Sequence, residues 1–205
     1  IRVPVVELDI AGLQQGLRNG AFRCVDVVAA YLERIERYDQ AAGLNAVSLV
    51  NPAVVDRAAA IDARLAAGEA LGPLAGVPLL VKDNFDTQDL PTTAGSVVLE
   101  GSMPPDDAHM IRRLRAADAL VLAKTNMAEW AFSPRQTVSS TRGTTANAYA
   151  LDRVPAGSSG GTASGVAASF GAAGLGSDTG NSIRGPSSHL ALFGIRSTLG
   201  LTSRD

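Results

Sequence analysis

Two short apolar runs that each end on a lysine constrain the fold of this chain more than any other feature. Residues 77–81 form the first run and lead to Lys82, and residues 120–123 form the second and lead to Lys124. Both runs are too short for helices, and their almost continuous apolar character is typical of strands buried on both faces of a sheet. We therefore expect two neighbouring buried strands at the centre of the fold.

Helical patterns separate these runs. In residues 25–38, Val28, Leu32 and Ile35 follow helical spacing, and charged residues occupy the other side. Further helices are expected over residues 52–67, from 106 or 107 to about 117, and over 162–172, with a strand pair or a strand and turn at 192–201. Helices that alternate with short buried strands predict an α/β fold with a largely parallel or mixed sheet.

Composition excludes several classes of function. The chain has 205 residues, 46% of them hydrophobic, and a net charge of -2, so it has a sizeable core and no basic surface for nucleic acid or membranes. The single cysteine, Cys24, excludes an internal disulfide, and no metal-ligand spacing is present. We expect no metal, no cofactor, no nucleic-acid partner and no membrane partner. A cytoplasmic location is expected, although the missing N-terminus, with no initiator methionine before Ile1, leaves secretion open.

Two glycine-rich runs carry serines that are candidate nucleophiles. Residues 157–161 contain Ser158 and Ser159, and residues 177–184 contain Ser182. A serine needs a proton acceptor before it can attack a carbonyl, and the chain has only two histidines. Of the 18 basic residues only two are lysines, and a buried neutral lysine can accept a proton through a second serine. The pattern favours a hydrolase of amide or related acyl bonds.

Each of these features also has a simpler interpretation. Residues 157–161 are compatible with a glycine turn that binds an anion, and residues 178–182 with an ordinary helix cap. Most lysines at strand ends only reach solvent, and spacing alone does not choose between Lys82 and Lys124. A non-catalytic anion-binding or structural module therefore remains an alternative.

A second alternative is an esterase centred on Ser159. Residues 157–161 match the G-x-S-x-G pattern of a nucleophile elbow, and Asp178 and His189 are the later residues available for a triad. The pattern requires a preceding strand, whereas residues 151–156 have the composition of a loop. This alternative predicts a histidine-dependent rather than a lysine-dependent activity.

A long polar segment, residues 133–156, is a candidate functional loop, because connections of this length are uncommon unless they serve a purpose. It begins at Ser133 and follows Trp130, an aromatic residue suited either to the core or to substrate contact. We take Trp130 and Ser133 as candidate substrate-binding residues.

Taken together, the motifs resemble the amidase signature family. The matching segments occur in the family's order over nearly the whole chain, and the separation of 24 residues between Ser158 and Ser182 also fits the family. The segments are Val81-Lys82-Asp83-Asn84, Ala123-Lys124-Thr125-Asn126-Met127-Ala128-Glu129-Trp130, Gly157-Ser158-Ser159-Gly160-Gly161 and Asp178-Thr179-Gly180-Asn181-Ser182-Ile183-Arg184.

The resemblance implies a Ser–cis-Ser–Lys triad. Ser182 would be the nucleophile, Ser158 the bridging serine in a cis peptide bond with Gly157, and Lys82 the terminal base. The backbone N–H groups of Thr179, Gly180, Asn181 and Ser182 would form the oxyanion hole. Asn181 replaces the glycine usual in the family, which makes its side chain a candidate for substrate specificity. The residues expected to support the site are Ser159, Asp178 and Arg184.

The family resemblance also implies an architecture and a reaction. Family domains are α/β/α sandwiches with a mixed, twisted sheet covered by helices on both faces. They are longer than 205 residues, so we expect residues 1–205 to be the N-terminal portion of one such domain. The remainder would be missing or lie on a second polypeptide, and a homodimer is open. The isolated chain would then expose a sheet edge and an apolar face.

The expected reaction is hydrolysis of a carboxylic amide through a serine acyl-enzyme, with no cofactor. The nature of the small-molecule amide is left open, and aryl, aliphatic and peptide amides, hydrazides and lactams all fit. The alternative within the family is the amidase (glutaminase) subunit of a tRNA-dependent amidotransferase.

Overall fold

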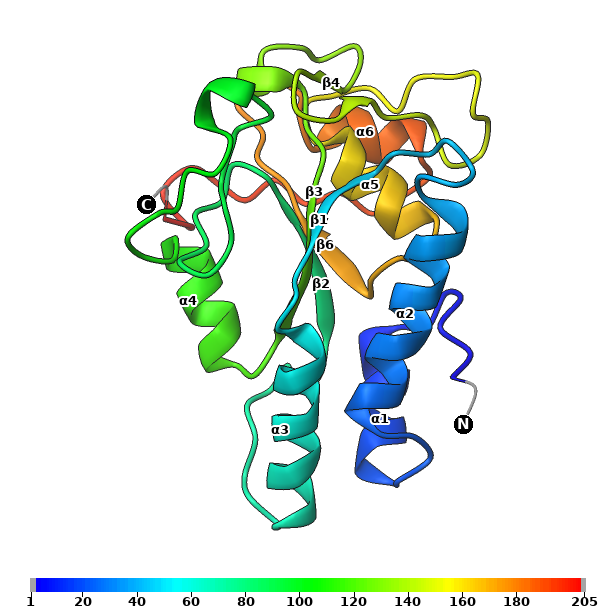
Figure 1. Cartoon of the computed structure of the whole chain (residues 1–205), viewed down its shortest axis with the longest axis vertical. Helices are drawn as coiled ribbons and strands as arrows, with labels where there is room; N and C mark the ends of the chain where they lie inside the picture. Colours follow the sequence, from blue (N-terminus) through cyan, green and yellow to red (C-terminus); the bar gives the residue numbers. More distant parts are fainter. Residues whose placement is uncertain (1–2, 204–205) are drawn as a thin grey trace.

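A four-stranded mixed sheet forms the centre of the computed structural model, which describes residues 3–203 (Figure 1). The strand order is β1-β3-β2-β6. Strand β2 is parallel to both of its neighbours, whereas β1 pairs with β3 in the antiparallel direction. The strands are β1 (Val47–Val50), β2 (Pro78–Lys82), β3 (Leu120–Thr125) and β6 (Ala173–Leu175). The two predicted central strands are therefore β2 and β3.

Helices cover both faces of this sheet, which confirms the expected α/β class. Figure 1 shows α4 on one side of the strands, and α1, α2 and α5 on the other. The larger core cluster joins β2 and β3 to α2 and α3, whereas a smaller one packs Val81 and Val121 against Ile111 of α4. The helices are α1 (Ile10–Arg18), α2 (Cys24–Tyr38), α3 (Val54–Ala66), α4 (His109–Ala116), α5 (Gly160–Ala167) and α6 (Arg184–His189).

The carboxyl ends of β2 and β3 meet at one edge of the sheet. Lys82 pairs with Thr125, and Val81 pairs with Lys124, so both lysines lie at this edge. The loops that follow the two strands, residues 83–108 and 126–159, contain short elements only: η1 (Val97–Leu99), η2 (Glu129–Ala131) and the hairpin of β4 (Val138–Ser139) and β5 (Gly143–Thr144). In parallel sheets this edge is where loops carry ligands and catalytic groups.

Several helix boundaries differ from the prediction, and two of these differences have a visible cause. Helix α4 begins at His109 instead of 106 or 107, because Asp107 accepts a hydrogen bond from Gln88 N at 2.9 Å and belongs to a loop. Helix α5 ends at Ala167 instead of Ala172. Ser169 has a left-handed backbone (φ 55°), and the chain then turns to bury Phe170 in the core.

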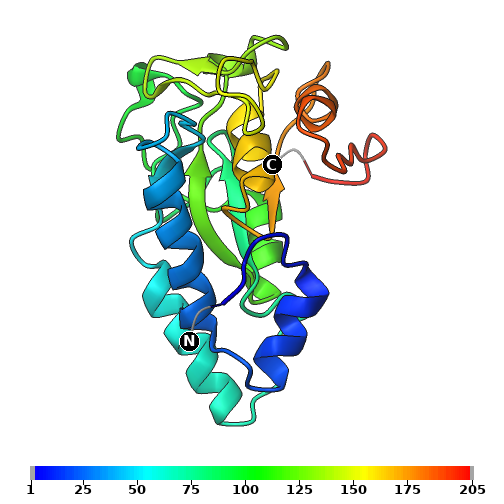
Figure 2. The ribbon, with the colours of Figure 1, turned by 90° about the vertical axis from the view of Figure 1, so that its right-hand side faces the viewer.

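The prediction of a strand pair, or of a strand and turn, at residues 192–201 is wrong. This segment contains no strand in the structure, and its apolar side chains point into solvent. Phe193, Ile195, Leu199 and Leu201 are at least 75% exposed. In Figure 2 the chain after α6 (red) stands apart from the rest of the molecule. Without a neighbouring strand to pair with, an apolar sequence does not form a sheet by itself.

Helix α1 and strand β1 were not anticipated. Asp9 caps α1 by accepting a hydrogen bond from Gly12 N at 2.6 Å, a local signal that the sequence does contain. Strand β1 has only four residues, and its pairing with β3 depends on a contact distant in sequence. None of the helices within residues 3–203 is both long and apolar enough to span a bilayer.

Candidate active site

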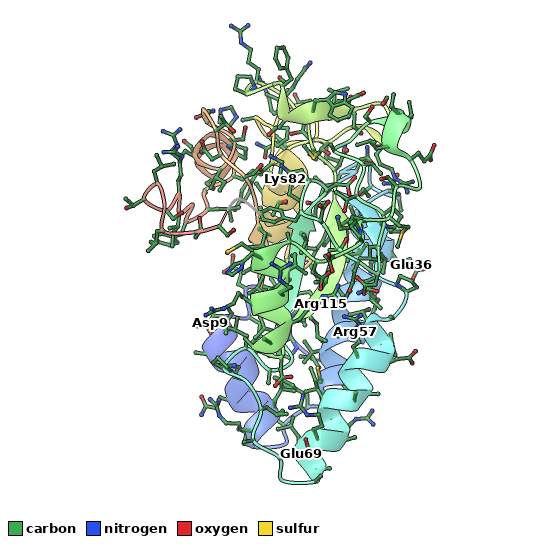
Figure 3. All side chains as sticks on the ribbon, turned by 90° about the vertical axis from the view of Figure 1, so that its left-hand side faces the viewer. Asp9, Glu36, Arg57, Glu69, Lys82 and Arg115 are labelled. Carbon is green, nitrogen blue, oxygen red and sulfur yellow. The ribbon has the colours of Figure 1, made fainter. Side chains whose placement is uncertain are left out.

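Lys82 lies at the carboxyl end of β2, and its side chain is completely buried. Figure 3 places it near the upper end of the sheet, close to α5. Its Nζ donates to Ser158 Oγ at 2.6 Å and to Ser177 Oγ at 2.9 Å. A third oxygen, the Ser177 carbonyl, lies 3.4 Å away. Lys82 is thus held between the two glycine-rich runs, as their predicted association requires.

The electrostatic environment favours the neutral amine of Lys82. Burial removes water from the ammonium and lowers the pKa of Lys82 to about 7, although the negative charge of Asp178 opposes the shift. A substantial fraction of the side chain is therefore uncharged at neutral pH. A neutral amine 2.6 Å from a hydroxyl can accept its proton, which is the task expected of a terminal base.

Ser158 lies in the loop that leads into α5 and is completely buried. The Gly157–Ser158 peptide bond is cis, as the family resemblance predicted. Glycine is required at position 157, because a Cβ there would lie 2.5 Å from the carbonyl oxygens of both Ser133 and Gln136. The expected functional loop therefore packs directly on this turn and fixes the backbone that presents Ser158.

Ser182 lies in the turn before α6 and is 8% exposed. The two glycine-rich runs meet through the backbone, where Ser159 N donates to Ser182 O at 3.3 Å. Within residues 3–203, no hydrogen bond joins the hydroxyls of Ser158 and Ser182. The structure thus joins the candidate nucleophile to Ser159, the neighbour of the bridging serine, and links Lys82 directly to Ser158.

The backbone N–H groups expected to form the oxyanion hole are available. In the described part of the chain, the N–H groups of Thr179, Gly180, Asn181 and Ser182 donate no hydrogen bond to another protein group. Thr179 and Gly180 are exposed. The side chain of Asn181 packs against α6, because a Cβ on Gly185 would lie 2.1 Å from its Nδ2. A row of unpaired N–H groups beside a buried serine suits a developing negative charge.

Asp178 and Arg184 fix this turn. Asp178 Oδ2 accepts hydrogen bonds from the N–H groups of Ile183 at 3.0 Å and Arg184 at 3.1 Å. The Arg184 guanidinium grips the same carboxylate through Nε at 3.0 Å and Nη2 at 3.1 Å. Burial raises the pKa of Asp178, but these hydrogen bonds outweigh it and lower the pKa to about 2. Asp178 is therefore ionised at all ordinary pH values.

The two other candidate substrate-binding residues lie outside this hydrogen-bonded group. Trp130 is 54% exposed and has a left-handed backbone with φ 54°. The Ser133 hydroxyl accepts the N–H groups of Arg135 and Gln136, at 3.3 and 3.4 Å. Neither side chain hydrogen-bonds to Lys82, Ser158 or Ser182 in the described residues. Their part in substrate binding stays a prediction.

Sequence reasoning missed two residues of this site, Ser177 and Asn84. Ser177 Oγ contacts Lys82, and Asn84 Nδ2 donates to the same oxygen at 2.9 Å. Both lie in segments that the sequence singled out. The parallel pairing of β2 with β6 was the missing information, because it brings the residues after both strands to one edge. Asn84 also lines a cavity of about 390 Å³, together with residues that include Thr92, Leu99 and Met103.

The arrangement that an esterase centred on Ser159 would need is not formed. Residues 151–158 contain no strand, and Ser159 Oγ donates to Ser177 O at 3.3 Å. His189 is exposed, and its Nδ1 lies 3.4 Å from Val154 O. Asp178 is engaged by Arg184. The three members of the hypothetical triad therefore have other partners.

Lys124 is equally buried but serves a different part of the molecule. Its Nζ donates to Phe85 O at 2.8 Å and to Thr92 Oγ1 at 2.9 Å, both in the loop after β2. None of its hydrogen bonds in the described residues reaches a serine of the glycine-rich runs. Of the two lysines, the structure therefore places Lys82 alone beside the serines.

Comparison with known proteins shows the family of this chain. The model of the Amidase family matches residues 26–205, so the chain belongs to the Amidase family. Among curated relatives, a glutamyl-tRNA(Gln) amidotransferase subunit from Thermobifida fusca is 43% identical over 201 residues, which is 98% of this chain and 40% of the relative. The corresponding protein from Acidothermus cellulolyticus is 46% identical over 180 residues, 87% of this chain and 35% of the relative.

Among solved structures, peptide amidase from Stenotrophomonas maltophilia superimposes with a TM-score of 0.93 at 40% identity. The match covers 98% of this chain and 42% of the peptide amidase chain. The chain thus spans about two fifths of the length of these relatives, and the matching part contains the sheet and the site described above.

Proposed function

We propose that this chain carries the catalytic residues of an amidohydrolase that cleaves a carboxylic amide C–N bond through a serine acyl-enzyme. The observation that carries the proposal is the 2.6 Å hydrogen bond between the completely buried Lys82 and Ser158. Membership of the Amidase family and the unpaired N–H groups before Ser182 support it.

In the proposed mechanism, Lys82 takes the proton of Ser158 Oγ while Ser158 takes that of Ser182 Oγ. Ser182 Oγ then attacks the amide carbonyl carbon, and the N–H groups of residues 179–182 stabilise the oxygen that becomes negatively charged. A single such donor contributes roughly 3 kcal/mol to transition-state stabilisation. The proton returns through Ser158 to the leaving nitrogen as the C–N bond breaks. Water, activated through the same relay, releases the acid.

A fluorophosphonate that modifies activated serines tests this proposal. We expect intact-mass spectrometry to show one adduct on wild-type protein, none on Ser182→Ala, and a rate at least about a hundredfold lower on Lys82→Met, because general-base help is worth 10²–10⁴-fold. His189→Ala is the matched control and should label at the wild-type rate. Absence of an adduct on folded, full-length protein would contradict the proposal and favour a binding role.

A second candidate is the glutaminase subunit of a tRNA-dependent amidotransferase, which the names of the curated relatives favour. The peptide amidase likeness favours instead a hydrolase of peptide amides. Release of ammonia from glutamine and from a C-terminal peptide amide, each measured with and without amidotransferase partner subunits, separates the two. Glutamine turnover that depends on the partners would select the amidotransferase role.

We also propose that residues 1–205 are the N-terminal portion of one amidase domain. The share of the relatives that the chain spans supports this, together with the exposed apolar side chains of residues 193–201. The partner would be further polypeptide that covers these side chains and completes the substrate pocket. A small-molecule amide would enter beside Ser182.

A further inference from the structure

Lys124 is a completely buried cation that the proposed reaction does not use. One loop, residues 83–92, surrounds its ammonium with oxygen atoms. These are Phe85 O at 2.8 Å, Thr92 Oγ1 at 2.9 Å, Thr87 Oγ1 at 3.2 Å, Pro91 O at 3.3 Å and Asp83 Oδ1 at 3.4 Å. An ammonium has only three N–H donors, so these five oxygens are more than it can bind at once. Their common distance of 3.4 Å or less shows that the loop is folded around the ammonium.

The charges around Lys124 explain why it tolerates burial. Desolvation lowers the pKa of Lys124, while the carboxylates of Asp83, Asp86 and Asp89 act in the opposite direction. A buried cation is costly unless matched by hydrogen bonds and opposite charge, and removal of one partner leaves the others unsatisfied. The loop and the ammonium therefore depend on each other.

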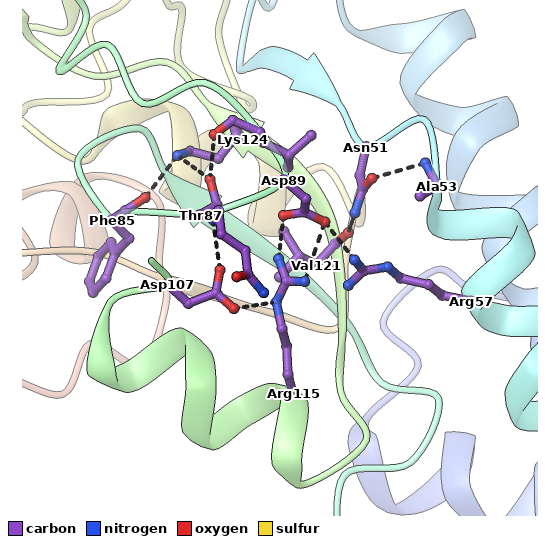
Figure 4. Close-up of polar contacts among 12 residues, drawn as sticks. Asn51, Ala53, Arg57, Phe85, Thr87, Asp89, Asp107, Arg115, Val121 and Lys124 are labelled. Carbon is purple, nitrogen blue, oxygen red and sulfur yellow. Dashed lines mark hydrogen bonds and ion pairs between the residues drawn. The ribbon is translucent and has the colours of Figure 1, made fainter. Parts of the chain in front are cut away.

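Arginines hold the same loop from its outer side (Figure 4). Asp89 forms ion pairs with Arg57 of α3 and Arg115 of α4, and Arg115 also pairs with Asp107. The loop is thus fixed by Lys124 on the sheet side and by two helices on the other. Both attachments belong to elements other than β2, so they set where the chain goes after Lys82.

The loop connects Lys124 to the candidate site. Asp83 directly follows Lys82, and its carboxylate accepts a hydrogen bond from Thr93 Oγ1 besides pairing with Lys124. The next residue, Asn84, donates to Ser177 Oγ at 2.9 Å, the same atom that accepts from Lys82. A continuous path of contacts therefore leads from Lys124 through two consecutive loop residues to the amine of Lys82.

We propose that Lys124 is a positioning residue: its ammonium folds residues 83–92 so that Asn84 holds Ser177 against Lys82. This inference rests on the proposed function, since it concerns the geometry of the proposed base. Lys124 does not touch the reacting atoms. Its role is to keep water away from Lys82 and to keep the Lys82 amine directed at Ser158.

Carbon-13 NMR of the lysine ε-carbons tests this directly. The signals of Lys82 and Lys124 in full-length protein are identified by their loss in Lys82→Met and Lys124→Met. The Lys82 signal should titrate near pH 7 in the wild type, because burial lowers its pKa to about 7. In Lys124→Met we expect its midpoint to move upward by about one unit or more, since a loosened loop admits water.

The matched control is Asp62→Asn. Asp62 fixes the start of α2 by accepting the N–H groups of Cys24 at 2.7 Å and Val25 at 3.1 Å. This variant should lose stability but leave the Lys82 midpoint unchanged. If Lys124→Met does not fold, Thr92→Val, which removes one oxygen from the ammonium, should produce a smaller upward shift. An unchanged midpoint in the folded variants would overturn the proposal.

Fluorophosphonate labelling separates this proposal from the proposed function. We expect Lys124→Met to label at least about tenfold more slowly, corresponding to about 1.4 kcal/mol, while Asp62→Asn keeps the wild-type rate at a temperature where it is folded. If wild-type protein is not labelled but the Lys82 midpoint still moves, the proposed function fails and the positioning role stands. Normal labelling together with an unchanged midpoint would refute the positioning role alone.

Discussion

At the scale of single residues, the candidate site depends on one lysine that sits between two hydroxyls. Lys82 Nζ is 2.6 Å from Ser158 Oγ and 2.9 Å from Ser177 Oγ, in a place that water does not reach. The first contact supplies the proposed route for a proton. The second keeps the amine directed at that route. Asn84 Nδ2 in turn donates to Ser177 Oγ, so a residue of the loop after β2 fixes the position of Ser177.

The lowered pKa of Lys82 gives a prediction for the pH profile. Burial lowers the pKa to about 7, so the amine is protonated below this pH and cannot accept a proton from Ser158. Above it the neutral form dominates. We expect the rate at which fluorophosphonate labels Ser182 to rise about tenfold per pH unit below the midpoint and to level off above it. A flat profile between pH 5 and about 9 would contradict a lysine base.

A second residue-scale prediction concerns Asp178. Its carboxylate accepts two backbone N–H groups and the Arg184 guanidinium, all of which strengthen when the acceptor is charged. Asp178→Asn should lower the free energy of unfolding by about 1–3 kcal/mol and slow labelling of Ser182. Chemical denaturation and intact-mass kinetics measure the two effects. Asp152→Asn, at an exposed ion pair, is the control and should change neither.

How much of the site could be predicted depended on which contacts are local. The order of motifs identified Lys82, Ser158 and Ser182, and the structure brings these three segments to one edge of the sheet. Asn84 and Ser177 were not predicted as site residues, because asparagine and serine are common in loops and indicate no particular function by themselves. Their meeting follows only from the pairing of β2 with β6, two strands about ninety residues apart in the chain.

At the scale of elements, the position of α5 follows from close approach to the sheet. A Cβ on Gly161 would lie 2.2 Å from Asn126 O and 2.7 Å from Ala46 O, both backbone atoms that cannot move aside easily. The first turn of α5 therefore packs directly on the ends of β3 and of the segment before β1. This approach places Ser158, just before the helix, within reach of Lys82.

Gly161→Ala tests this packing. Alanine would favour the helix by up to about 1 kcal/mol, but the collision with two carbonyl oxygens should outweigh this and destabilise the protein by about 1–3 kcal/mol. Thermal unfolding measures the difference. Gly180→Ala is the control for stability, because a Cβ there meets no atom within 4 Å. A raised midpoint in Gly161→Ala would show that α5 can move away from the sheet.

The elements that could be predicted were those whose own sequence pattern matches their surroundings. Strands β2 and β3 are buried at every position, and their unbroken apolar runs indicate this. Residues 192–201 also contain several apolar residues, but they lie where the described chain offers no strand to pair with, so apolar content alone gave a wrong prediction. Helix α5 ends early because the chain turns to bury Phe170 in the core. Helix propensity describes local sequence only and therefore does not predict this packing.

At the scale of the whole molecule, the sheet separates two kinds of surface. Helices α1, α2, α4 and α5 cover its faces, whereas the segment after α6 presents apolar side chains to solvent (Figure 2). Phe193 and Leu199 are the most exposed of these, at 106% and 86%. Such a group of side chains is unusual on a monomeric surface, which supports the proposal that further polypeptide covers it.

The expected behaviour of the 205-residue chain alone is self-association through this segment. Replacement of Phe193 and Leu199 by serine together should shift the chain toward monomer, because these side chains lose the apolar area that drives contact. Sedimentation velocity at several concentrations measures the change. Replacement of Val55 and Val98 by serine is the control and should leave the association unchanged, as both are exposed elsewhere. Equal effects of the two double variants would contradict the assignment.

The burial of both lysines has a consequence for the chemistry of the surface. Lys82 and Lys124 are the only lysines among the 205 residues, and neither exposes any of its side chain. The folded chain therefore offers its arginines to solvent but no side-chain amine. An acylating reagent aimed at lysine would react with these positions only when the molecule opens. The rate of lysine acylation would therefore measure how often the folded chain opens enough to expose Lys82 or Lys124.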